Sequence, residues 1–409
     1  MRFDIMARDP STRARAGLLH TPHGIIETPA FMPVGTTGTV KGMTQEDLEE
    51  LGVRLLLANT YHLYLRPGHE TIREFGGLHR FMGWPHAILT DSGGFQIMSL
   101  KGLGQVTEDG FRFRSHLDGS SHFLSPERAV EVQMALGADI IMTLDECVEF
   151  PSSHETLRRV VKLTGLWARR AKESWLRQNS REWGVGSGES RTTSSSFANS
   201  RDQVPNTESP IPNPALFGIV QGGTERNLRC ESAEEICDIG FEGYAVGGLS
   251  VGEPKNETYD IVGFTAELLP EDRPRYLMGV GTPADLAECV ALGIDLFDCV
   301  MPTRNARNAC VFTAEGKLVI RNACYARDPG PLDPACECRV CRRYSRGYIR
   351  HLFVAGEILA AILATYHNLH FYLDTMHQIR QAIRAGDFER FLSKARTGAF
   401  TGMPRMPRT

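Results

Sequence analysis

The sequence predicts an α/β fold organised as a (β/α)8 barrel, the TIM barrel. Eight short β-rich runs occur along the chain, and each ends in glycine or polar residues. Helix-compatible segments separate most of these runs. Because parallel strands need crossover helices between them, eight strand–helix units in series favour a closed barrel over the main alternative, a doubly wound open sheet. The length of 409 residues allows such a barrel and an appendage.

The predicted elements begin with an antiparallel lead-in. In residues 1–27, apolar and polar side chains alternate, and Pro-Ser and Pro-His-Gly turns separate the runs. The eight strands are predicted at residues 29–36, 55–61, 87–93, 140–147, 216–223, 244–250, 275–281 and 296–303. Helices are predicted between them, for example at residues 44–51, 126–137 and 155–177. From residue 345 to about 395 the chain is predicted to be helical, with breaks near His367 and Gly386.

One segment departs from this pattern. Residues 184–212 contain seven Ser, three Thr, three Gly and three Pro, with almost no apolar side chains. Such a segment cannot bury enough surface to offset its chain entropy. We therefore expect a disordered insertion between a helix and the fifth strand, where it need not disturb the barrel.

Composition narrows the class of protein. Hydrophobic residues make up 42% of the chain and charged residues 23%, so a sizeable core can be buried and global disorder is excluded. No apolar run approaches the roughly 20 residues of a membrane span, and the N-terminus has no signal-peptide hydrophobic region. We therefore expect a cytoplasmic protein with no membrane partner. Its ten cysteines are then free thiols or metal ligands rather than disulfides.

Charge is distributed unevenly along the chain. The formal net charge is −4, yet residues 301–409 carry 17 Lys and Arg against 8 Asp and Glu. A basic end of this kind indicates a polyanionic partner. Charge alone does not distinguish such a partner from the alternative, in which the basic residues form a solvated helical surface with no binding role.

Polar side chains gather where the predicted strands end. Asp91, Asp145 and Asp298 each stand near the end of an apolar run, and Gln221 ends another. Paired carboxylates suit reactions at an anomeric carbon, because one attacks and the other moves protons. A strand-end Asp can instead cap the next helix. In a barrel, however, these three Asp residues and the Gln221 carboxamide would lie at the same end. That placement favours an active site over three separate helix caps.

Cys336, Cys338 and Cys341 form the sharpest local signal. Three thiols within six residues can reach one tetrahedral metal ion, with a fourth ligand from elsewhere. The candidates for that ligand are His351, His367 and His370. A closed set of three thiolates and one imidazole has no open position, so the metal would be structural. Three unligated thiols are the competing interpretation.

Several strings now resemble one family, the tRNA-guanine transglycosylases, also called queuine tRNA-ribosyltransferases. The strings are DSGGFQ, DEC, GIVQGG, GGLSVGE, YLMGVGTP, FDCVMPTRNARN and the spaced cysteines followed by HN. The resemblance runs from about residue 3 to 391, apart from residues 184–212. It implies a TIM barrel with an embedded zinc subdomain that removes guanine from the wobble position of tRNA anticodons. A 7-deazaguanine is inserted there without cutting the RNA strand.

The resemblance also implies roles for individual residues. Asp298 would be the nucleophile and Asp91 the general acid and base. The base would be bound by Ser92, Gly93, Gly94, Phe95, Asp145, Cys147, Gln221, Gly248, Leu249 and Met278. RNA would contact Gly279, Val280, Gly281, Thr282, Pro283, Ala284, Asp285, Thr303, Arg304, Asn305, Ala306 and Arg307. Zinc would be held by Cys336, Cys338, Cys341 and His367.

The same resemblance implies an organisation of the chain. Residues 1–303 would form the catalytic barrel with the insertion, residues 304–396 the zinc-binding subdomain with closing helices, and residues 397–409 a flexible tail. The partners would be a tRNA with a wobble guanine, a small 7-deazaguanine and, as a homodimer, a second copy of the chain.

The incoming base is predicted from two positions. Val251 stands where the eukaryotic pattern has Gly, and Cys147 is similar to the bacterial pattern. A β-branched Val narrows the pocket, which favours prequeuosine base, 7-aminomethyl-7-deazaguanine, over the bulkier queuine. Glu253 is expected to orient the peptide that reads the aminomethyl group. Three other functions are alternatives to base exchange in the anticodon. They are those of an archaeosine-type enzyme, a non-catalytic RNA-binding subunit of the same fold and a zinc hydrolase.

Overall fold

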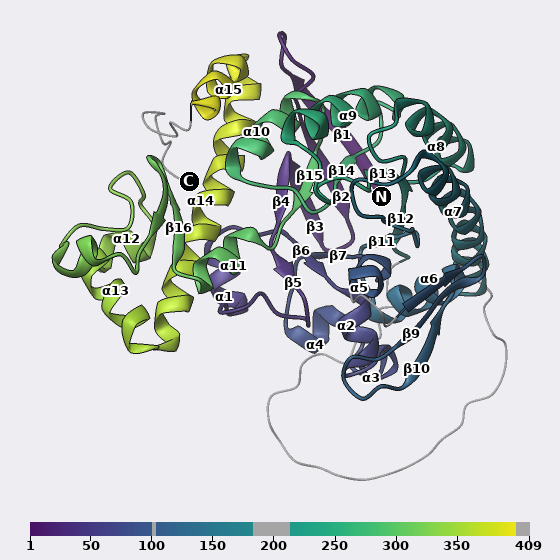
Figure 1. Ribbon diagram of the computed structural model, residues 1–409, viewed down its shortest axis with the longest axis horizontal. Helices are drawn as coiled ribbons and strands as arrows, with labels where there is room; N and C mark the ends of the chain where they lie inside the picture. Colours follow the sequence, from purple (N-terminus) through teal and green to yellow (C-terminus); the bar gives the residue numbers. More distant parts are fainter. Residues whose placement is uncertain (100–103, 183–212, 398–409) are drawn as a thin grey trace.

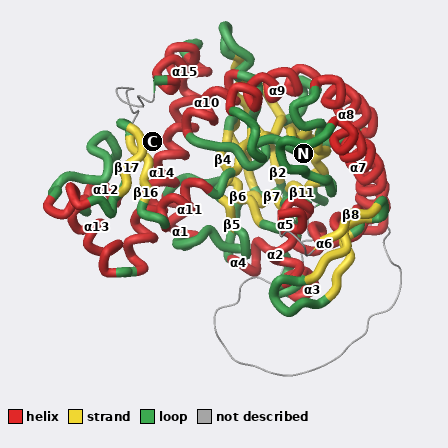
Figure 2. Tube along the Cα trace, in the orientation of Figure 1, coloured by secondary structure: helices red, strands yellow, loops and turns green. Residues whose placement is uncertain are grey.

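The computed structural model describes residues 1–99, 104–182 and 213–397. The predicted insertion at residues 184–212 lies outside the described residues, as does nearly all of the predicted tail. Within the described part, helices enclose a central parallel sheet (Figures 1 and 2). None of the described helices is both long enough and apolar enough to cross a membrane.

The central sheet is a closed barrel. Its strands are β4 (Ala30–Met32), β5 (Val34–Gly35), β6 (Leu55–Ala58), β7 (Ala87–Thr90), β11 (Ile140–Met142), β12 (Ala215–Val220), β13 (Gly243–Val246), β14 (Arg275–Leu277) and β15 (Leu296–Asp298). They are hydrogen-bonded in the order β4-β15-β14-β13-β12-β11-β7-β6-β5, with parallel neighbours.

One strand closes the ring. Only Pro33 separates β4 from β5, so the two are halves of a single strand that pairs with β15 through its first half and β6 through its second. Proline has no N–H to give to a ladder, which explains the break. The eight predicted strands and the predicted barrel are thereby confirmed. The predicted runs extend further than the strands, and their last residues form the loops at the strand ends.

The barrel strands are buried on both faces. Leu55 and Leu57 of β6 point into the barrel interior, whereas Leu56 packs outward with the helices. The same alternation places Leu89 inside and Ile88 outside. Strands covered on both sides need such continuous apolar runs, and that requirement explains why they are clearly visible in the sequence.

Helices follow most strands. The longer ones are α6 (Pro126–Leu136), α7 (His154–Glu182), α8 (Arg226–Ile239), α9 (Lys255–Leu268) and α10 (Pro283–Ala291), and the shorter ones are α1 (Gln45–Glu50), α2 (Thr60–Leu65), α3 (His69–Glu74), α4 (Leu78–Met82) and α5 (Gly94–Ser99). The helices predicted at residues 44–51, 126–137 and 155–177 are among them. Local chemistry starts several: Ser125 caps α6, and Thr282 forms a capping box with Asp285.

The lead-in is a three-stranded antiparallel sheet, as predicted. It consists of β1 (Arg2–Arg8), β2 (Arg15–Thr21) and β3 (Gly24–Thr28). Arg15 of β2 forms a fully buried ion pair with Asp295, just before β15, with an Nη2–Oδ2 distance of 2.7 Å. The lead-in is therefore attached at the amino ends of the barrel strands.

A second antiparallel sheet was not predicted. It contains β8 (Gly104–Thr107), β9 (Gly110–Arg114) and β10 (Ser121–Leu124), between β7 and α6. Phe111 of β9 is buried and packs edge-on against Trp167 of α7. Phe111 and Trp167 belong to one buried apolar cluster, and this contact between distant segments has no local sequence signal.

The C-terminal part contains α11 (Met301–Arg307), β16 (Cys310–Thr313), β17 (Gly316–Val319), a 3-10 turn η1 (Ala323–Arg327), α12 (Arg339–Arg343), α13 (Arg346–Ala355), α14 (Ile358–Ala385) and α15 (Phe388–Arg396). Helix α14 packs against β4 and α11, while α12 and α13 lie on its other side, away from the barrel (Figure 1).

The helix break predicted near His367 is wrong. Helix α14 continues through His367 and Asn368, and both side chains are fully buried. Asn368 Oδ1 accepts a 3.0 Å hydrogen bond from the backbone N–H of Phe312. The polar pair His367 and Asn368 suggests a loop in the sequence, but in the folded protein tertiary contacts satisfy its hydrogen-bonding groups. The break falls instead at Gly356, in the left-handed region with φ 78°. The break predicted at Gly386 is confirmed.

Candidate active site and metal centre

Three acidic side chains lie at the carboxyl ends of barrel strands. Asp91 directly follows β7, Asp145 lies shortly after β11 and Asp298 is the last residue of β15. Gln221 is the first residue after β12. Since parallel strands in one barrel point the same way, their carboxyl ends form a single rim. The structure therefore brings these four residues to the same end of the barrel.

Asp91 is held by three donors. Its Oδ1 accepts a 2.7 Å hydrogen bond from the Thr60 backbone, and its Oδ2 accepts bonds from Asn59 Nδ2 and, at 2.8 Å, from Gln96 Nε2. Burial raises the pKa of Asp91 to about 6; the hydrogen bonds oppose that rise, and the charge of Asp298 adds to it. The carboxyl group is thus fixed in place and titrates close to neutral pH.

The two oxygens of the Asp298 carboxylate differ in their contacts. Oδ1 accepts hydrogen bonds from the Tyr276 hydroxyl at 2.6 Å and the Gly279 backbone at 2.8 Å. The backbone of Asp298 itself also stabilises the ionised carboxylate. Burial raises the pKa of Asp298, while the two hydrogen bonds stabilise the ionised form. The residue is half-buried, and the bonds from Tyr276 and Gly279 fix the orientation of its carboxylate.

Asp145 and Gln221 form a second polar group beside Asp91. Gln221 Nε2 donates to Asp145 Oδ2 at 2.7 Å, and Ser92 Oγ donates to Oδ1 at 3.4 Å. Burial raises the pKa of Asp145 to about 6, and the charge of Asp91 contributes. Because a charge shifts a pKa only over a short range, the three carboxyl groups are electrostatic neighbours.

Glycines allow this close packing. A Cβ at Gly247 would lie 2.8 Å from Gln221 Nε2, and a Cβ at Gly94 would lie 2.7 Å from the Asp145 carbonyl. Gly248 and Gly93 adopt positive φ values of 65° and 85°. Side chains at these positions would block the rim or strain the backbone.

Apolar groups border the polar ones. Phe95, at the start of α5, is 54% exposed, which is unusual for an aromatic side chain. Met278 follows β14 and is half-buried, and Leu249 is buried. Burial raises the pKa of Cys147 to about 12, so this residue is a neutral thiol rather than a nucleophile.

A cavity of about 140 Å³ lies beside Gln221, on the side away from the three carboxyl groups, none of which lines it. Gln221 and Gly248 lie on its wall together with Val251 and Glu253. Glu253 accepts hydrogen bonds from the backbone N–H groups of Ser250 and Val251. The glutamate therefore holds the peptide segment after Leu249 in one orientation.

The predicted RNA-contact residues divide into accessible and buried groups. Accessible surface remains on Gly279, Thr282, Ala284, Arg304, Asn305 and Arg307, whereas Val280, Gly281, Pro283, Asp285, Thr303 and Ala306 are buried. The Asp285 carboxylate is satisfied within the protein by Lys255 Nζ at 2.6 Å and the Tyr259 hydroxyl at 2.5 Å.

Sequence reasoning missed three partners of the two key carboxylates, namely Thr60, Gln96 and Tyr276. Gln96 stands in the DSGGFQ string but was not singled out. Tyr276 belongs to the inward-facing set of β14, which a period of two along that strand would have indicated. The backbone contact from Thr60 had no sequence signal.

The sulfur atoms of Cys336, Cys338 and Cys341 meet a ring nitrogen of His367. These donor atoms lie within 4.8 Å of one another, and all four residues are buried. His367 Nδ1 faces Cys341 Sγ at 3.3 Å, and its Nε2 lies 2.7 Å from the Phe312 carbonyl. If Nε2–H donates to that carbonyl, Nδ1 presents its lone pair toward the sulfurs. Three thiolates and one imidazole fit tetrahedral zinc.

The remaining two candidate histidines differ from His367. His351 is exposed. His370 Nδ1 lies 3.5 Å from Cys336 Sγ and does not join the four-donor cluster. The predicted choice of His367 is confirmed, and the closed donor set indicates a structural metal.

Comparisons with known proteins agree with this geometry. A family model described as Queuine tRNA-ribosyltransferase matches residues 9–399. Proteins named Queuine tRNA-ribosyltransferase are similar over nearly their whole length. The one from Thermoanaerobacter pseudethanolicus is 54% identical over 384 residues, covering 94% of each chain. The one from Caldanaerobacter subterraneus is 53% identical with the same coverage. That from Solibacter usitatus is 53% identical over 391 residues, covering 95% of this chain and 96% of its own.

Proposed function

Because the chain belongs to the queuine tRNA-ribosyltransferase family, we propose that Asp298 and Asp91 carry out its base exchange as nucleophile and proton carrier. The protein is a pentosyltransferase that exchanges guanine in tRNA in queuosine biosynthesis. Its structural zinc site is formed by Cys336, Cys338, Cys341 and His367. The observation that supports the proposed roles best is the asymmetry of the two carboxyl groups. Tyr276 and Gly279 both donate to Oδ1 of Asp298, whereas donors from other residues engage both oxygens of Asp91.

The first step is proposed to be attack by Asp298 Oδ2 on C1′ of the wobble ribose. An ester bond forms between the carboxylate and C1′, the C1′–N9 bond breaks, and guanine leaves with the bonding electrons and one proton. Tyr276 and Gly279 hold Oδ1 and orient the attacking oxygen. The deazaguanine then attacks C1′ and releases Asp298. Two displacements retain the configuration of the sugar, and the ester conserves the bond energy.

Asp91 is proposed to move the protons. It gives a proton to the departing guanine and takes one from the incoming base, returning to its starting state. A pKa of about 6 suits both directions near neutral pH. The fixed position of Asp91 keeps it aimed at one place in the pocket.

Base recognition is proposed to rest on Asp145, Gln221 and the backbone at Gly248 and Leu249. These groups offer acceptors and a donor to a purine edge. Phe95 and Met278 would lie on the two faces of the ring, in agreement with the unusual exposure of Phe95. The wobble base must leave its stack to reach them, which takes little energy in an anticodon loop.

Prequeuosine base, 7-aminomethyl-7-deazaguanine, is proposed as the incoming base. The relatives' printed name refers to queuine, but the cavity beside Gln221 is small and Val251 lies on its wall. Glu253 holds the Ser250 and Val251 N–H groups. We propose that this arrangement leaves the preceding carbonyl groups free to accept from the aminomethyl ammonium group.

The test is competition for exchange into tRNA. Radiolabelled guanine should enter a tRNA with a wobble guanine, and prequeuosine base should compete at a concentration at least about tenfold below that of queuine, because Val251 leaves little room for the cyclopentenediol. Val251→Gly should narrow this preference. Absence of guanine exchange would contradict the function, whereas exchange with a preference for queuine would contradict only the choice of base.

Contacts to tRNA are proposed at residues 279–285 and 303–307. Arg304 is exposed next to the rim. Arg307 Nη1 is buried and has no hydrogen-bond partner among the described residues. A guanidinium donor without a protein partner can donate to an RNA phosphate or to the edge of a base.

The pH profile should identify the nucleophile. Ionised Asp298 is needed for attack, so kcat/KM should fall as pH drops through its raised pKa. Tyr276→Phe removes a hydrogen bond that favours ionisation, so the acid limb should move to higher pH, by about one unit. Tyr244→Phe, at a barrel tyrosine that bonds the Phe241 backbone instead, is the control. An acid limb that stays in place in Tyr276→Phe would contradict the assignment.

We further propose that the protein acts as a homodimer in the cytoplasm, where one subunit positions tRNA for the other. Exposed apolar side chains support a protein contact: Tyr348 and Val354 on α13, and Ile358 at the start of α14, which is 78% exposed. Sedimentation velocity measures the assembly directly. We also propose that the chain divides into a catalytic barrel, which ends at residue 303, and a zinc subdomain over residues 304–396.

A further inference from the structure

Two histidines and an aspartate meet at the end of the barrel opposite the catalytic rim. Asp139 directly precedes β11, whereas Asp145 follows that strand, so the two carboxylates lie at its opposite ends. His23 stands in the turn between β2 and β3, and His79 belongs to α4. None of these residues takes part in the proposed exchange chemistry.

The geometry of this cluster is specific. His23 Nδ1 lies 2.8 Å from Asp139 Oδ1, and His79 Nε2 lies 3.1 Å from Oδ2. The two imidazole rings stack with centroids 3.6 Å apart and planes 15° from parallel. The Asp139 side chain has no exposed surface, and the Ile88 backbone N–H donates to it at 2.8 Å. A buried carboxylate is therefore held rigidly beneath two parallel rings.

We propose that His23, His79 and Asp139 bind a divalent first-row transition metal ion such as Zn²⁺ or Co²⁺. Their donor atoms lie within 4.8 Å of one another. The nitrogen–oxygen separations of 2.8 and 3.1 Å are hydrogen-bond distances, so the side chains have to move apart slightly to reach the about 3.3 Å between ligand atoms of a tetrahedral ion with bonds of about 2.0–2.1 Å. Imidazole and carboxylate are ligands that such ions accept.

The hydrogen-bonding roles of the two rings are compatible with a cation at their nitrogen edges, beside Asp139. Without a metal, each imidazole has to donate an N–H to Asp139, and two imidazolium rings stacked face to face would repel one another. On binding, each facing nitrogen presents its lone pair. The proton moves to the other nitrogen of a neutral ring, or is released from a cationic ring. The single negative charge of Asp139 then compensates part of the double positive charge of the bound ion, and the two imidazoles are neutral.

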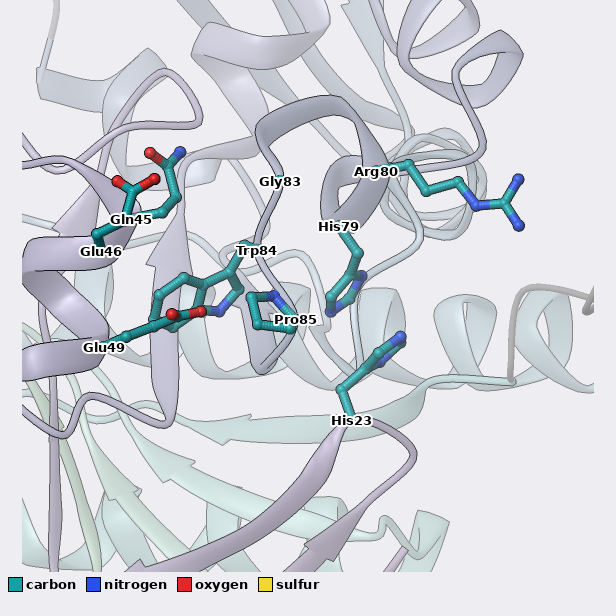
Figure 3. Close-up of a pocket in the computed structure, with 9 residues that line it drawn as sticks. All are labelled: His23, Gln45, Glu46, Glu49, His79, Arg80, Gly83, Trp84 and Pro85. Carbon is teal, nitrogen blue, oxygen red and sulfur yellow. The ribbon is translucent and has the colours of Figure 1, made fainter. Parts of the chain in front are cut away.

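An adjoining cavity gives the ion access and further coordination positions. It has a volume of about 440 Å³ and is lined by His23 and His79 on one side and by Glu46 and Glu49 of α1 on another. In Figure 3 the two imidazoles lie one above the other beside Pro85, and Arg80 extends away from them. The glutamates add negative charge, and water can complete the coordination, unlike at the closed cysteine site.

The test is Co²⁺ titration of zinc-loaded protein. Wild type should bind an additional equivalent of Co²⁺ that produces d–d absorption without the thiolate charge-transfer band expected of the cysteine site. The His23→Gln/His79→Gln double variant should lose this equivalent. His86→Gln is the matched control, since His86 lies nearby, within 3.9 Å of Glu49, but outside the cluster.

Folding and activity separate a lost site from a damaged protein. The double variant should keep guanine exchange, because the cluster is remote from the catalytic rim. Added Zn²⁺ should raise the Tm of wild type and of His86→Gln, as expected for a ligand of the native state, but not that of the double variant. No additional equivalent in wild type, or its retention in the double variant, would overturn the proposal. Should the double variant misfold, the stoichiometry of wild type alone decides.

Discussion

Asp298→Asn is expected to lower guanine exchange by more than about 10³-fold, as removal of a catalytic nucleophile does. A carboxamide is nearly isosteric with the carboxylate, and its oxygen can still accept the bonds from Tyr276 and Gly279. It is a poor nucleophile, so the ester to C1′ does not form. The measurement is incorporation of labelled guanine into tRNA, together with a denaturing gel of enzyme and tRNA mixed without the incoming base, which would otherwise displace Asp298 from C1′. Wild type should give a covalent adduct and the variant none.

The controls for this variant address fold and tRNA binding. Affinity for tRNA should stay within about threefold, because Asp298 lies at the bond to be broken rather than on the phosphate-facing loops. Asp260→Asn, on α9, removes a carboxylate from an exposed ion pair with Arg226 of α8 and should leave exchange unchanged. Substantial guanine incorporation by Asp298→Asn would refute its assignment as nucleophile and shift that role to Asp91.

Cys338→Ala is expected to lose zinc and to destabilise the C-terminal subdomain strongly. Cys338 is a zinc ligand, and its sulfur also accepts the Cys341 backbone N–H as the cap of α12. Because metal binding is coupled to folding, losing a ligand should cost several kcal/mol, of order 3 kcal/mol or more. Elemental analysis should show less than stoichiometric zinc, and thermal unfolding should begin at a lower temperature.

A second cysteine in the same subdomain provides the comparison. Cys324, in the 3-10 turn, is exposed and lies outside the donor cluster. Cys324→Ala should keep the zinc and the Tm of wild type. Unchanged zinc content in Cys338→Ala would exclude this ligand set, whatever the effect on stability.

Much of the barrel could be predicted because its signals are local. Each strand is covered on both faces, so it appears as a short apolar run, and each run ends where the chain turns at glycine or polar residues. Once eight such runs are recognised, parallel geometry places Asp91, Asp145, Gln221 and Asp298 at one rim. The cysteine spacing is local in the same sense, and three ligands of the zinc site follow from it.

The fourth zinc ligand shows where local signals end. Cysteine spacing alone leaves three candidates for this ligand: His351, His367 and His370. Position along α14 decides among them: His367 is buried within the helix and faces the thiols, while His351 is exposed on α13. The helix continues through His367 because Phe312, more than fifty residues before it in the chain, satisfies both His367 and Asn368.

What the amino-acid order determined for this protein is the set of strands, their polar ends and the metal-binding spacing, since each depends on residues close together in the chain. The folded structure alone decided which oxygen of Asp298 accepts the bonds from Tyr276 and Gly279, which donors hold Asp91, and that His23, His79 and Asp139 share one place. These features depend on contacts between segments far apart in sequence, such as Thr60 with Asp91 and His23 with Asp139. The physical reason is that hydrogen-bond partners and pKa values are set by burial and by neighbours in space, and neither is encoded in a local pattern.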